Sequence, residues 1–114
     1  MTDASGLAIE YRPVVKADYD GLGHLWWESW RSTGLDIAQA TTEAVLRRRI
    51  DDEMDGEWDV TVALAGKRLV GFLALKTRLA TLDQLFIASG FQGKGIGRQL
   101  VFFAKQKMPR GFRI

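Results

Sequence analysis

The feature that most constrains how this chain folds is a glycine-rich segment, residues 91–97, in which every second residue from Gly93 onward is glycine. The apolar run before it, residues 79–87, predicts a strand. After it, apolar residues in the range 96–104 recur at helical spacing and predict a helix that Pro109 ends. The chain therefore passes directly from a strand, through a glycine loop, into a helix.

Because glycine has no side chain, the backbone amides of this loop are accessible to a ligand. The start of a helix leaves its first N–H groups without internal partners and carries the positive end of the helix dipole. The loop is therefore suited to an anionic phosphate group, and Lys94 and Arg98 would add positive charge. A glycine-rich turn that binds nothing is the alternative, and the glycines alone do not decide between the two.

The spacing of the glycines excludes two better-known phosphate loops. A Walker loop requires Gly-x-x-x-x-Gly-Lys-Ser/Thr, and no such string occurs in this sequence. A dinucleotide-binding fingerprint requires Gly-x-Gly-x-x-Gly, whereas Gly93, Gly95 and Gly97 are each two residues apart. Neither class of nucleotide site is therefore indicated.

Two helices are predicted in the N-terminal half. The first follows Asp18, because apolar residues recur at helical spacing up to Trp30, and Gly34 is a suitable stop. The second spans residues 42–55, with a threonine to cap its start and Gly56 after its end. Charged side chains on its outer face pair at i, i+4 spacing, so this face is predicted to be solvated and is assigned no chemistry.

Further strands complete the pattern. Residues 7–15 predict a short strand at a sheet edge, because Pro13 lacks the N–H that pairing requires. Residues 58–64 alternate and residues 69–75 are almost wholly apolar, with a turn between them, which predicts a hairpin entering the middle of a sheet. Residues 112–114 begin another strand, which the sequence does not continue.

Composition narrows the class of protein. With 114 residues and 46% hydrophobic content, residues 1–114 are expected to form one domain. The 16 basic and 14 acidic residues give a net charge of +2, too small an excess to indicate nucleic-acid binding. Because there is no cysteine and one histidine, neither a disulfide, a thiol nucleophile nor a metal site is expected. Without a signal peptide or a long apolar run, a cytoplasmic protein without membrane contact is expected.

Around the glycine loop the sequence resembles motif A of the GNAT superfamily of acyl-CoA N-acyltransferases, Gln/Arg-x-x-Gly-x-Gly/Ala. Residues 92–97, Gln-Gly-Lys-Gly-Ile-Gly, match the motif fully, and the order of elements is also similar to that family. The resemblance covers essentially the whole chain. It implies an α/β fold (α+β by layer) with a mixed, mostly antiparallel sheet. The implied order is a strand, two helices, three strands, the glycine loop, a long helix and the start of a fifth strand.

The resemblance implies an N-acetyltransferase that moves an acetyl group from acetyl-CoA directly to a primary amine of an unidentified small molecule or peptide. In such proteins the pantetheine arm pairs with backbone groups of the fourth strand, here Leu85, Phe86 and Ile87. The pyrophosphate lies on the amides of the glycine loop. The loop residues implied to contact the cofactor are Gln92, Gly93, Lys94, Gly95, Ile96, Gly97 and Arg98.

Catalysis in this family is mainly positioning. The acceptor amine is brought to the thioester carbonyl, the tetrahedral oxyanion takes a backbone amide of the fourth strand, and a base removes the ammonium proton. The base is often a carboxylate on or near that strand, and Asp83 is the nearest candidate. A solvated or capping strand aspartate is the alternative interpretation of Asp83.

The first helix borders the acceptor pocket in this family. Trp27 and Glu28 are therefore implied as acceptor contacts, and Glu28 is also the second candidate for the base. Trp26 and Trp30 share one helix face and are predicted to pack in the core. His24 is predicted to be a surface or capping residue rather than a base.

The sequence departs from the family after Ile114. A family member continues into another helix and a final hairpin, which supplies an Asn or Tyr near the sulfur, and none of that segment is in this sequence. We expect a truncated product, a protein completed by a partner or swapped segment, or a degenerate module. A non-catalytic acyl-CoA-binding or protein-interaction module is therefore the alternative function. The exposed sheet edge favours a homodimer.

Overall fold

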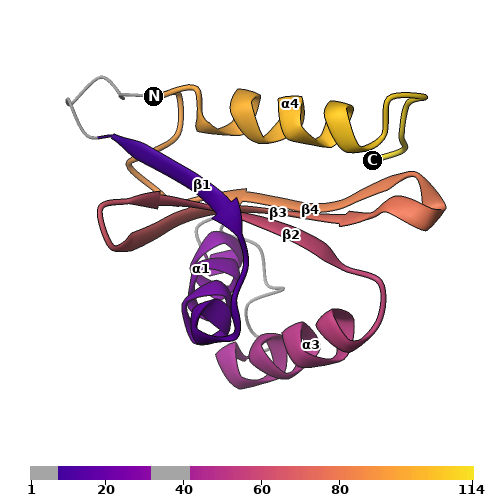
Figure 1. Ribbon diagram of the computed structural model, residues 1–114. Helices are drawn as coiled ribbons and strands as arrows, with labels where there is room; N and C mark the ends of the chain where they lie inside the picture. The colour runs from indigo at the N-terminus through magenta and orange to yellow at the C-terminus, as the bar shows by residue number, and fades with distance from the viewer. Residues whose placement is uncertain (1–7, 32–41) are drawn as a thin grey trace.

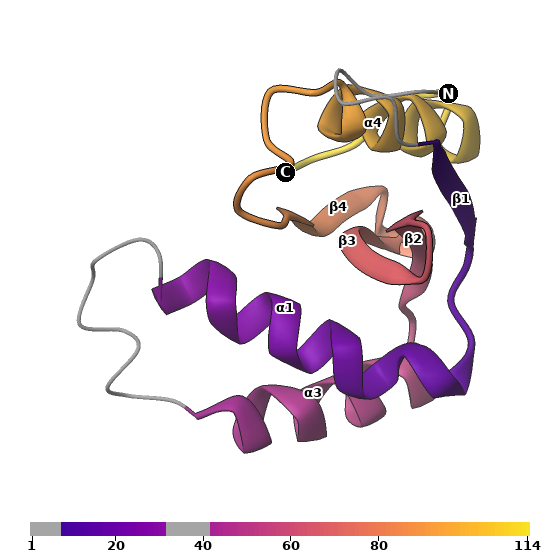
Figure 2. The same cartoon turned by 90° about the vertical axis from the view of Figure 1, so that its left-hand side faces the viewer.

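The computed structural model describes residues 8–31 and 42–114, which form a four-stranded sheet with helices on both faces (Figure 1, Figure 2). The strands β1 (Ile9–Pro13), β2 (Asp59–Ala65), β3 (Arg68–Lys76) and β4 (Thr81–Ile87) lie in that order, and all neighbours are antiparallel. Helices α1 (Tyr19–Arg31) and α3 (Glu43–Asp55) cover one face, and α4 (Ile96–Lys107) covers the other. The predicted α/β layering and element order are confirmed.

The N-terminal helices lie close to where the sequence places them. A short 3-10 helix, Lys16–Asp18, precedes α1. The hydroxyl of Thr42 caps α3 by accepting a hydrogen bond from the Val45 N–H at 3.2 Å. The predicted stop at Gly34 and the predicted strand residue Leu7 lie outside the described residues. No helix in the described ranges is both long and apolar enough to cross a membrane.

The β4 strand begins two residues later than predicted. Thr77–Leu79 forms a 3-10 helix, and Ala80 follows in the left-handed region at a φ of 48°. These residues make the turn from β3 into β4, so Leu79 lies outside the sheet and its side chain is half exposed. The prediction that the strand begins at residue 79 was wrong, because an apolar residue at the end of an apolar run can belong either to the strand or to the turn before it.

The last residues run parallel to β4 along its outer side. Arg113 forms a parallel bridge with Thr81. The Leu82 N–H donates to the Arg113 carbonyl at 2.7 Å, and the Arg113 N–H donates to the Ala80 carbonyl at 2.7 Å. This isolated bridge is a parallel contact beside an otherwise antiparallel sheet, and it lies within the predicted strand start at residues 112–114.

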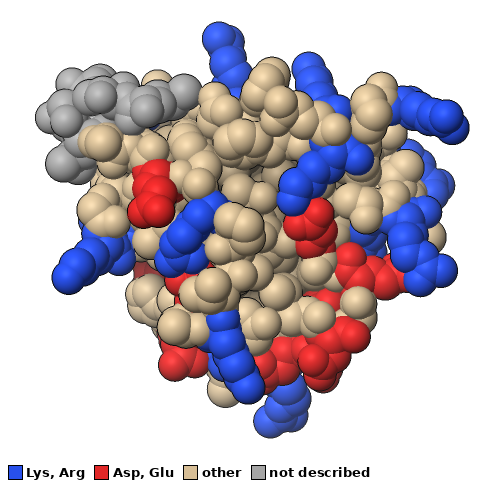
Figure 3. Space-filling model, in the orientation of Figure 1, with Lys and Arg blue, Asp and Glu red and all other residues tan. Residues whose placement is uncertain are grey.

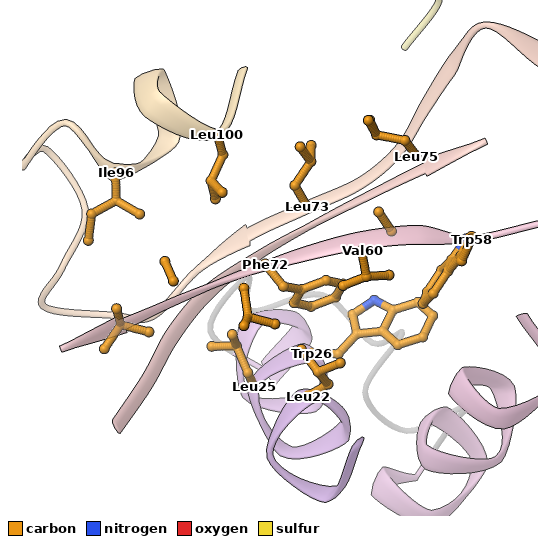
Figure 4. Packing of buried hydrophobic residues seen from close by; sticks show 14 of the residues in the cluster. Leu22, Leu25, Trp26, Trp58, Val60, Phe72, Leu73, Leu75, Ile96 and Leu100 are labelled. Carbon is orange, nitrogen blue, oxygen red and sulfur yellow. The ribbon is translucent and has the colours of Figure 1, made fainter. Parts of the chain in front are cut away.

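The core lies on both sides of the sheet (Figure 4). Alternate residues of β3 supply the two layers, because successive side chains of a strand point to opposite faces. Phe72 faces α1, where its ring centroid lies 6.4 Å from that of Trp26, whereas Leu73 and Leu75 face α4. Trp26 is fully buried, which confirms its predicted packing role, while the side chain of Trp30 lies outside what the structure describes.

Helices α1 and α3 approach closely at Gly23. A Cβ atom added there would lie 3.3 Å from Cα of Arg47, so a side chain would push the helices apart. Arg47 itself ties the helices together, since its Nε donates to Asp20 on α1 at 2.6 Å. At Gly21 an added Cβ would make only an ordinary contact, at 3.6 Å. Of these two glycines of α1, Gly23 therefore has a packing role.

An ion pair fixes the start of α1 against β1. Both terminal nitrogens of Arg12 donate to the carboxylate of Asp18, at 2.7 and 3.0 Å. The Val15 N–H donates to the same carboxylate at 2.8 Å. The hydrogen bond from Arg12 lowers the pKa of Asp18 below its ordinary value, because it favours the ionised form.

Candidate functional site

The glycine loop joins β4 to α4 with a backbone conformation that favours glycine. Gly93 and Gly95 have φ angles of 77° and 88°, in the left-handed region that other residues rarely adopt. Gly95 is the N-cap residue of α4 and makes no side-chain cap. The first amides of α4 therefore remain available to a ligand, as the sequence predicts.

A hollow of about 510 Å³ opens beside these amides. Its walls are formed by Ile87, Phe91, Gln92, Gly93, Gly95, Gly97 and Arg98. The Gln92 side-chain amide donates to the Ile87 carbonyl at 3.4 Å, which holds the loop against the end of β4. Lys94 does not line the hollow, and the Ile96 side chain is buried in the core, so Ile96 can offer only its backbone. Helix-terminal amides and a guanidinium thus face one space, which suits an anionic group.

The side of the molecule that carries α4 is basic. Residues 84–114 contain six Lys and Arg residues and no acidic residue, whereas residues 1–83 contain 10 basic and all 14 acidic residues. Figure 3 shows Lys and Arg side chains over the α4 layer and Asp and Glu side chains gathered toward the α3 side. The small net charge therefore conceals a separation of charge that makes the potential around the glycine loop positive.

The β4 strand presents part of its backbone to the open side of the sheet. The Ala88 N–H donates inward to β3 at 2.8 Å. Since successive residues of a paired strand direct their polar groups to opposite sides, those of Phe86 also face β3, and those of Leu85 and Ile87 face outward. No strand within the described residues pairs with β4 along this part of its outer edge. Leu85 and the N–H of Ile87 can therefore receive an extended ligand, whereas the Ile87 carbonyl already accepts from Gln92.

A β-bulge interrupts β4 at Asp83. Two adjacent residues of β3 face Gln84 and Leu82, so Asp83 between them has no partner in β3. Its Oδ2 accepts a hydrogen bond from the indole N–H of Trp58 at 2.8 Å. The candidate base therefore lies at an irregularity of the strand. Its carboxylate is held on the face of the sheet that packs against α1, where Trp58 lies.

A second hollow, of about 610 Å³, lies between α1 and the adjacent ends of β3 and β4. It shares Ile87 and Gln92 with the first hollow, so the two adjoin. Glu28 and His24 contribute to its wall from α1, together with Arg68 from β3. The predicted acceptor contact Glu28 is thus on a cavity next to the glycine loop.

Trp27 has different surroundings from Glu28. Its side chain does not line either hollow, and the guanidinium of Arg31 lies 4.5 Å from the centre of its ring. His24 is exposed, as predicted, and its Nδ1 lies 3.1 Å from a carboxylate oxygen of Glu43 on α3. Among residues 8–31 and 42–114, no group of three or more acidic or histidine side chains is arranged to hold a metal ion.

Comparison with known proteins decides the family. The model of the acetyltransferase (GNAT) domain family matches residues 26–111, a range that includes β4, the glycine loop and α4. The chain belongs to this GNAT family. Comparison with curated proteins gives no match.

Solved structures share the GNAT fold of this chain. The PaiA N-acetyltransferase from Thermoplasma acidophilum, in complex with coenzyme A, is 23% identical with a TM-score of 0.69, over 91% of this chain and 74% of its own. An acetyltransferase from Thermus thermophilus is 26% identical with a TM-score of 0.65, over 85% and 67% of the two chains. The apo form of YjaB from Escherichia coli is 26% identical with a TM-score of 0.62, over 90% and 68%.

Sequence reasoning about this GNAT domain missed the bulge at Asp83, the Trp58 hydrogen bond and the close contact at Gly71. A Cβ atom added at Gly71 would lie 3.1 Å from Cδ1 of Ile87 and 3.2 Å from the Phe86 carbonyl oxygen. Glycine therefore lets the end of β4 lie close against β3. A signal for this contact was present, because a glycine inside an apolar strand often marks a close backbone approach.

Proposed function

We propose that this chain binds acetyl-CoA and transfers the acetyl group directly to the primary amine of a small molecule or peptide. The observation that carries the proposal is the position of the uncapped amides of α4 beside the open edge of β4. Phosphate groups fit the first feature and an extended chain of amides fits the second. Coenzyme A contains both groups, joined in that order.

In this proposal the pyrophosphate accepts hydrogen bonds from the backbone amides of the glycine loop, from Gly93 to Arg98. Lys94 and Arg98 supply positive charge, and Gln92 keeps the loop against β4. The pantetheine arm extends along β4 and pairs with the outward-facing backbone groups of Leu85 and the N–H of Ile87. Phe86 contributes through its ring, which packs 5.4 Å from that of Phe72 and holds the strand to the core.

The transfer step follows from placing the thioester near the bulge. The neutral amine attacks the thioester carbonyl, and a backbone N–H of the irregular part of β4 stabilises the oxyanion. The C–S bond then breaks, the nitrogen gives its remaining excess proton to the departing CoA thiolate, and the acetyl group stays on nitrogen as an amide. Asp83 is proposed to take the ammonium proton beforehand. No covalent enzyme intermediate is required, because the acceptor nitrogen is itself the nucleophile.

The acceptor is proposed to approach from the α1 side of β4. Glu28 is the proposed contact for a second polar group of the acceptor, because its carboxylate lines the hollow that adjoins the glycine loop, a hollow that Asp83 does not line. Trp27, on the adjacent surface of α1, is the proposed apolar contact.

Two measurements on the unmodified chain test the proposal. Acetyl-CoA should raise the melting temperature, because a ligand that binds the folded state stabilises it. A panel of primary amines, from amino acids and polyamines to peptides, should then reveal release of CoA thiol above the hydrolysis background. Stabilisation without turnover by any amine would support a non-catalytic acyl-CoA-binding module instead. No stabilisation by CoA or acetyl-CoA would contradict both functions.

A further inference from the structure

A hydrogen bond across the sheet joins Trp58 to Asp83. The indole Nε1 of Trp58 donates to Oδ2 of Asp83 at 2.8 Å. Trp58 immediately precedes β2, whereas Asp83 is on β4, so the contact passes over the intervening strand β3. It therefore links the irregular part of β4 to a region of the chain that has no pairing contact with that strand.

The ring of Trp58 is held in one place. Trp58 is 7% exposed, and its ring centroid lies 5.8 Å from that of Trp26 and 6.4 Å from that of Phe72 (Figure 4). A close-packed aromatic side chain in a core has few accessible rotamers. The core packing therefore restricts the direction of its N–H bond independently of the hydrogen bond to Asp83.

The orientation of Asp83 depends on this donor. In a regular strand, pairing and alternation decide where a side chain points, but a bulge residue is unpaired and its side chain is re-aimed. The indole N–H can donate a hydrogen bond and cannot accept one, so it occupies one carboxylate oxygen and takes no proton. The other oxygen, Oδ1, has no hydrogen-bond partner among residues 8–31 and 42–114.

We propose that Trp58 is a positioning residue that holds Asp83 by Oδ2 so that Oδ1 receives the acceptor's proton, a role that rests on the function proposed above. The ammonium group gives one proton to Oδ1 of Asp83. The freed lone pair forms the N–C bond to the acetyl carbon and gives the tetrahedral oxyanion, and the C–S bond breaks as that oxyanion collapses. The nitrogen then loses its second excess proton, which ends on the departing CoA thiolate.

Three variants separate this role from a structural one. Trp58→Phe keeps an aromatic ring but removes the N–H. Asp83→Asn keeps an oxygen that accepts the indole hydrogen bond but cannot take a proton. The third variant combines both changes. Each is measured for kcat, KM for acetyl-CoA, melting temperature and, where Trp58 is present, the NMR resonance of its indole N–H.

The expected result is that the effects of the two substitutions on kcat are not independent. Trp58→Phe should lower kcat about tenfold, the size of one lost hydrogen bond, with KM for acetyl-CoA unchanged. Asp83→Asn should lower kcat at least about 100-fold, the usual contribution of a general base, and should keep the indole resonance in the range of a hydrogen-bonded N–H. In the double variant, Trp58→Phe should cause no further loss of kcat, because the carboxylate that it positions is already absent.

Two outcomes would overturn the inference while leaving the proposed acetyl transfer from acetyl-CoA intact. The first is an Asp83→Asn variant that turns over as fast as the wild type. The second is a double variant in which the two losses of kcat multiply, since that would give Trp58 a purely structural effect. A wild-type chain that binds acetyl-CoA but acetylates no amine would overturn both this inference and the proposed function.

Discussion

The two layers that cover the sheet are built in opposite ways. The α4 layer is basic, begins with glycines in left-handed conformations and leaves helix-terminal amides uncapped. In the layer of α1 and α3, Arg47 of α3 forms an ion pair with Asp20 of α1, and Arg12 of β1 pairs with Asp18 just before α1. Charged side chains are thus paired in the layer of α1 and α3, whereas the backbone amides at the start of α4, where a ligand is proposed, are left without a cap. Substitutions in the α4 layer should therefore change ligand affinity, and substitutions in the layer of α1 and α3 should change the free energy of unfolding.

The largest effect is expected from a bulky side chain in the glycine loop. Gly95→Trp should raise the dissociation constant for CoA at least about 100-fold, because the indole would fill the space beside the uncapped amides and forfeit the phosphate contacts. Isothermal titration calorimetry measures this. Gly66→Trp in the β2–β3 turn is the matched control, since Gly66 also has a positive φ, 63°, and open space around it. Equal CoA affinity of the two variants would place the phosphate site elsewhere.

A smaller change at Gly71 should lower both the stability and the CoA affinity, because this residue of β3 lies against the end of β4 that borders the proposed site. Gly71→Ala should destabilise the fold by about 1–3 kcal/mol, the usual cost of overpacking, since the added methyl meets Ile87 and the Phe86 carbonyl oxygen. Urea unfolding measures the loss. CoA affinity should fall by a few fold, because the end of β4 must move. Unchanged unfolding and affinity would show that β4 adjusts without consequence.

Within the ion-paired layer, two helix glycines should respond in opposite directions. Gly23→Ala should destabilise by about 1–2 kcal/mol, because its methyl would meet the backbone of Arg47. Gly21→Ala should be neutral or stabilising by up to about 1 kcal/mol, because alanine favours a helix and meets only an ordinary contact. Thermal unfolding of both variants gives the comparison. Similar losses at both positions would mean that the contact at Gly23 has no special role.

The smallest effect concerns pH. Because the folded state lowers the pKa of Asp18, its ion pair with Arg12 contributes stability above the unfolded pKa of about 3.9, and that contribution is lost as pH falls through the folded pKa. Stability should therefore decline below about pH 4, and Asp18→Asn should be less stable near neutral pH with a shallower decline. Urea unfolding at a series of pH values measures both. An identical decline in the variant would assign the acid sensitivity to other carboxylates.

The sequence predicted those parts of the structure that depend on local pattern. The alternation before Gly66 and the helical spacing after Gly95 each reflect contacts between near neighbours, and the hairpin and α4 were predicted with boundaries within about two residues. The glycine loop was equally visible, because positive φ angles and an uncapped helix start follow from residue type.

Other features depend on contacts between segments far apart in the chain. The bulge at Asp83 shifts the pairing of two strands by one residue, and no local pattern marks it. Its hydrogen bond to Trp58 spans 25 residues of sequence. Trp27 and Glu28 are adjacent in sequence, yet only Glu28 lines a cavity. Which neighbour faces the cavity depends on how α1 is rotated against the sheet, and the apolar spacing defines that rotation too coarsely.

The absence of acidic residues from residue 84 onward has a consequence for kinetics. A polyanionic ligand diffusing toward the molecule meets a positive potential on the α4 side, so its encounters are biased toward the face that holds the glycine loop. Added salt shortens the range of that attraction. The association rate constant for CoA should therefore fall steeply with ionic strength, while the dissociation rate constant, governed by short-range contacts, should change little.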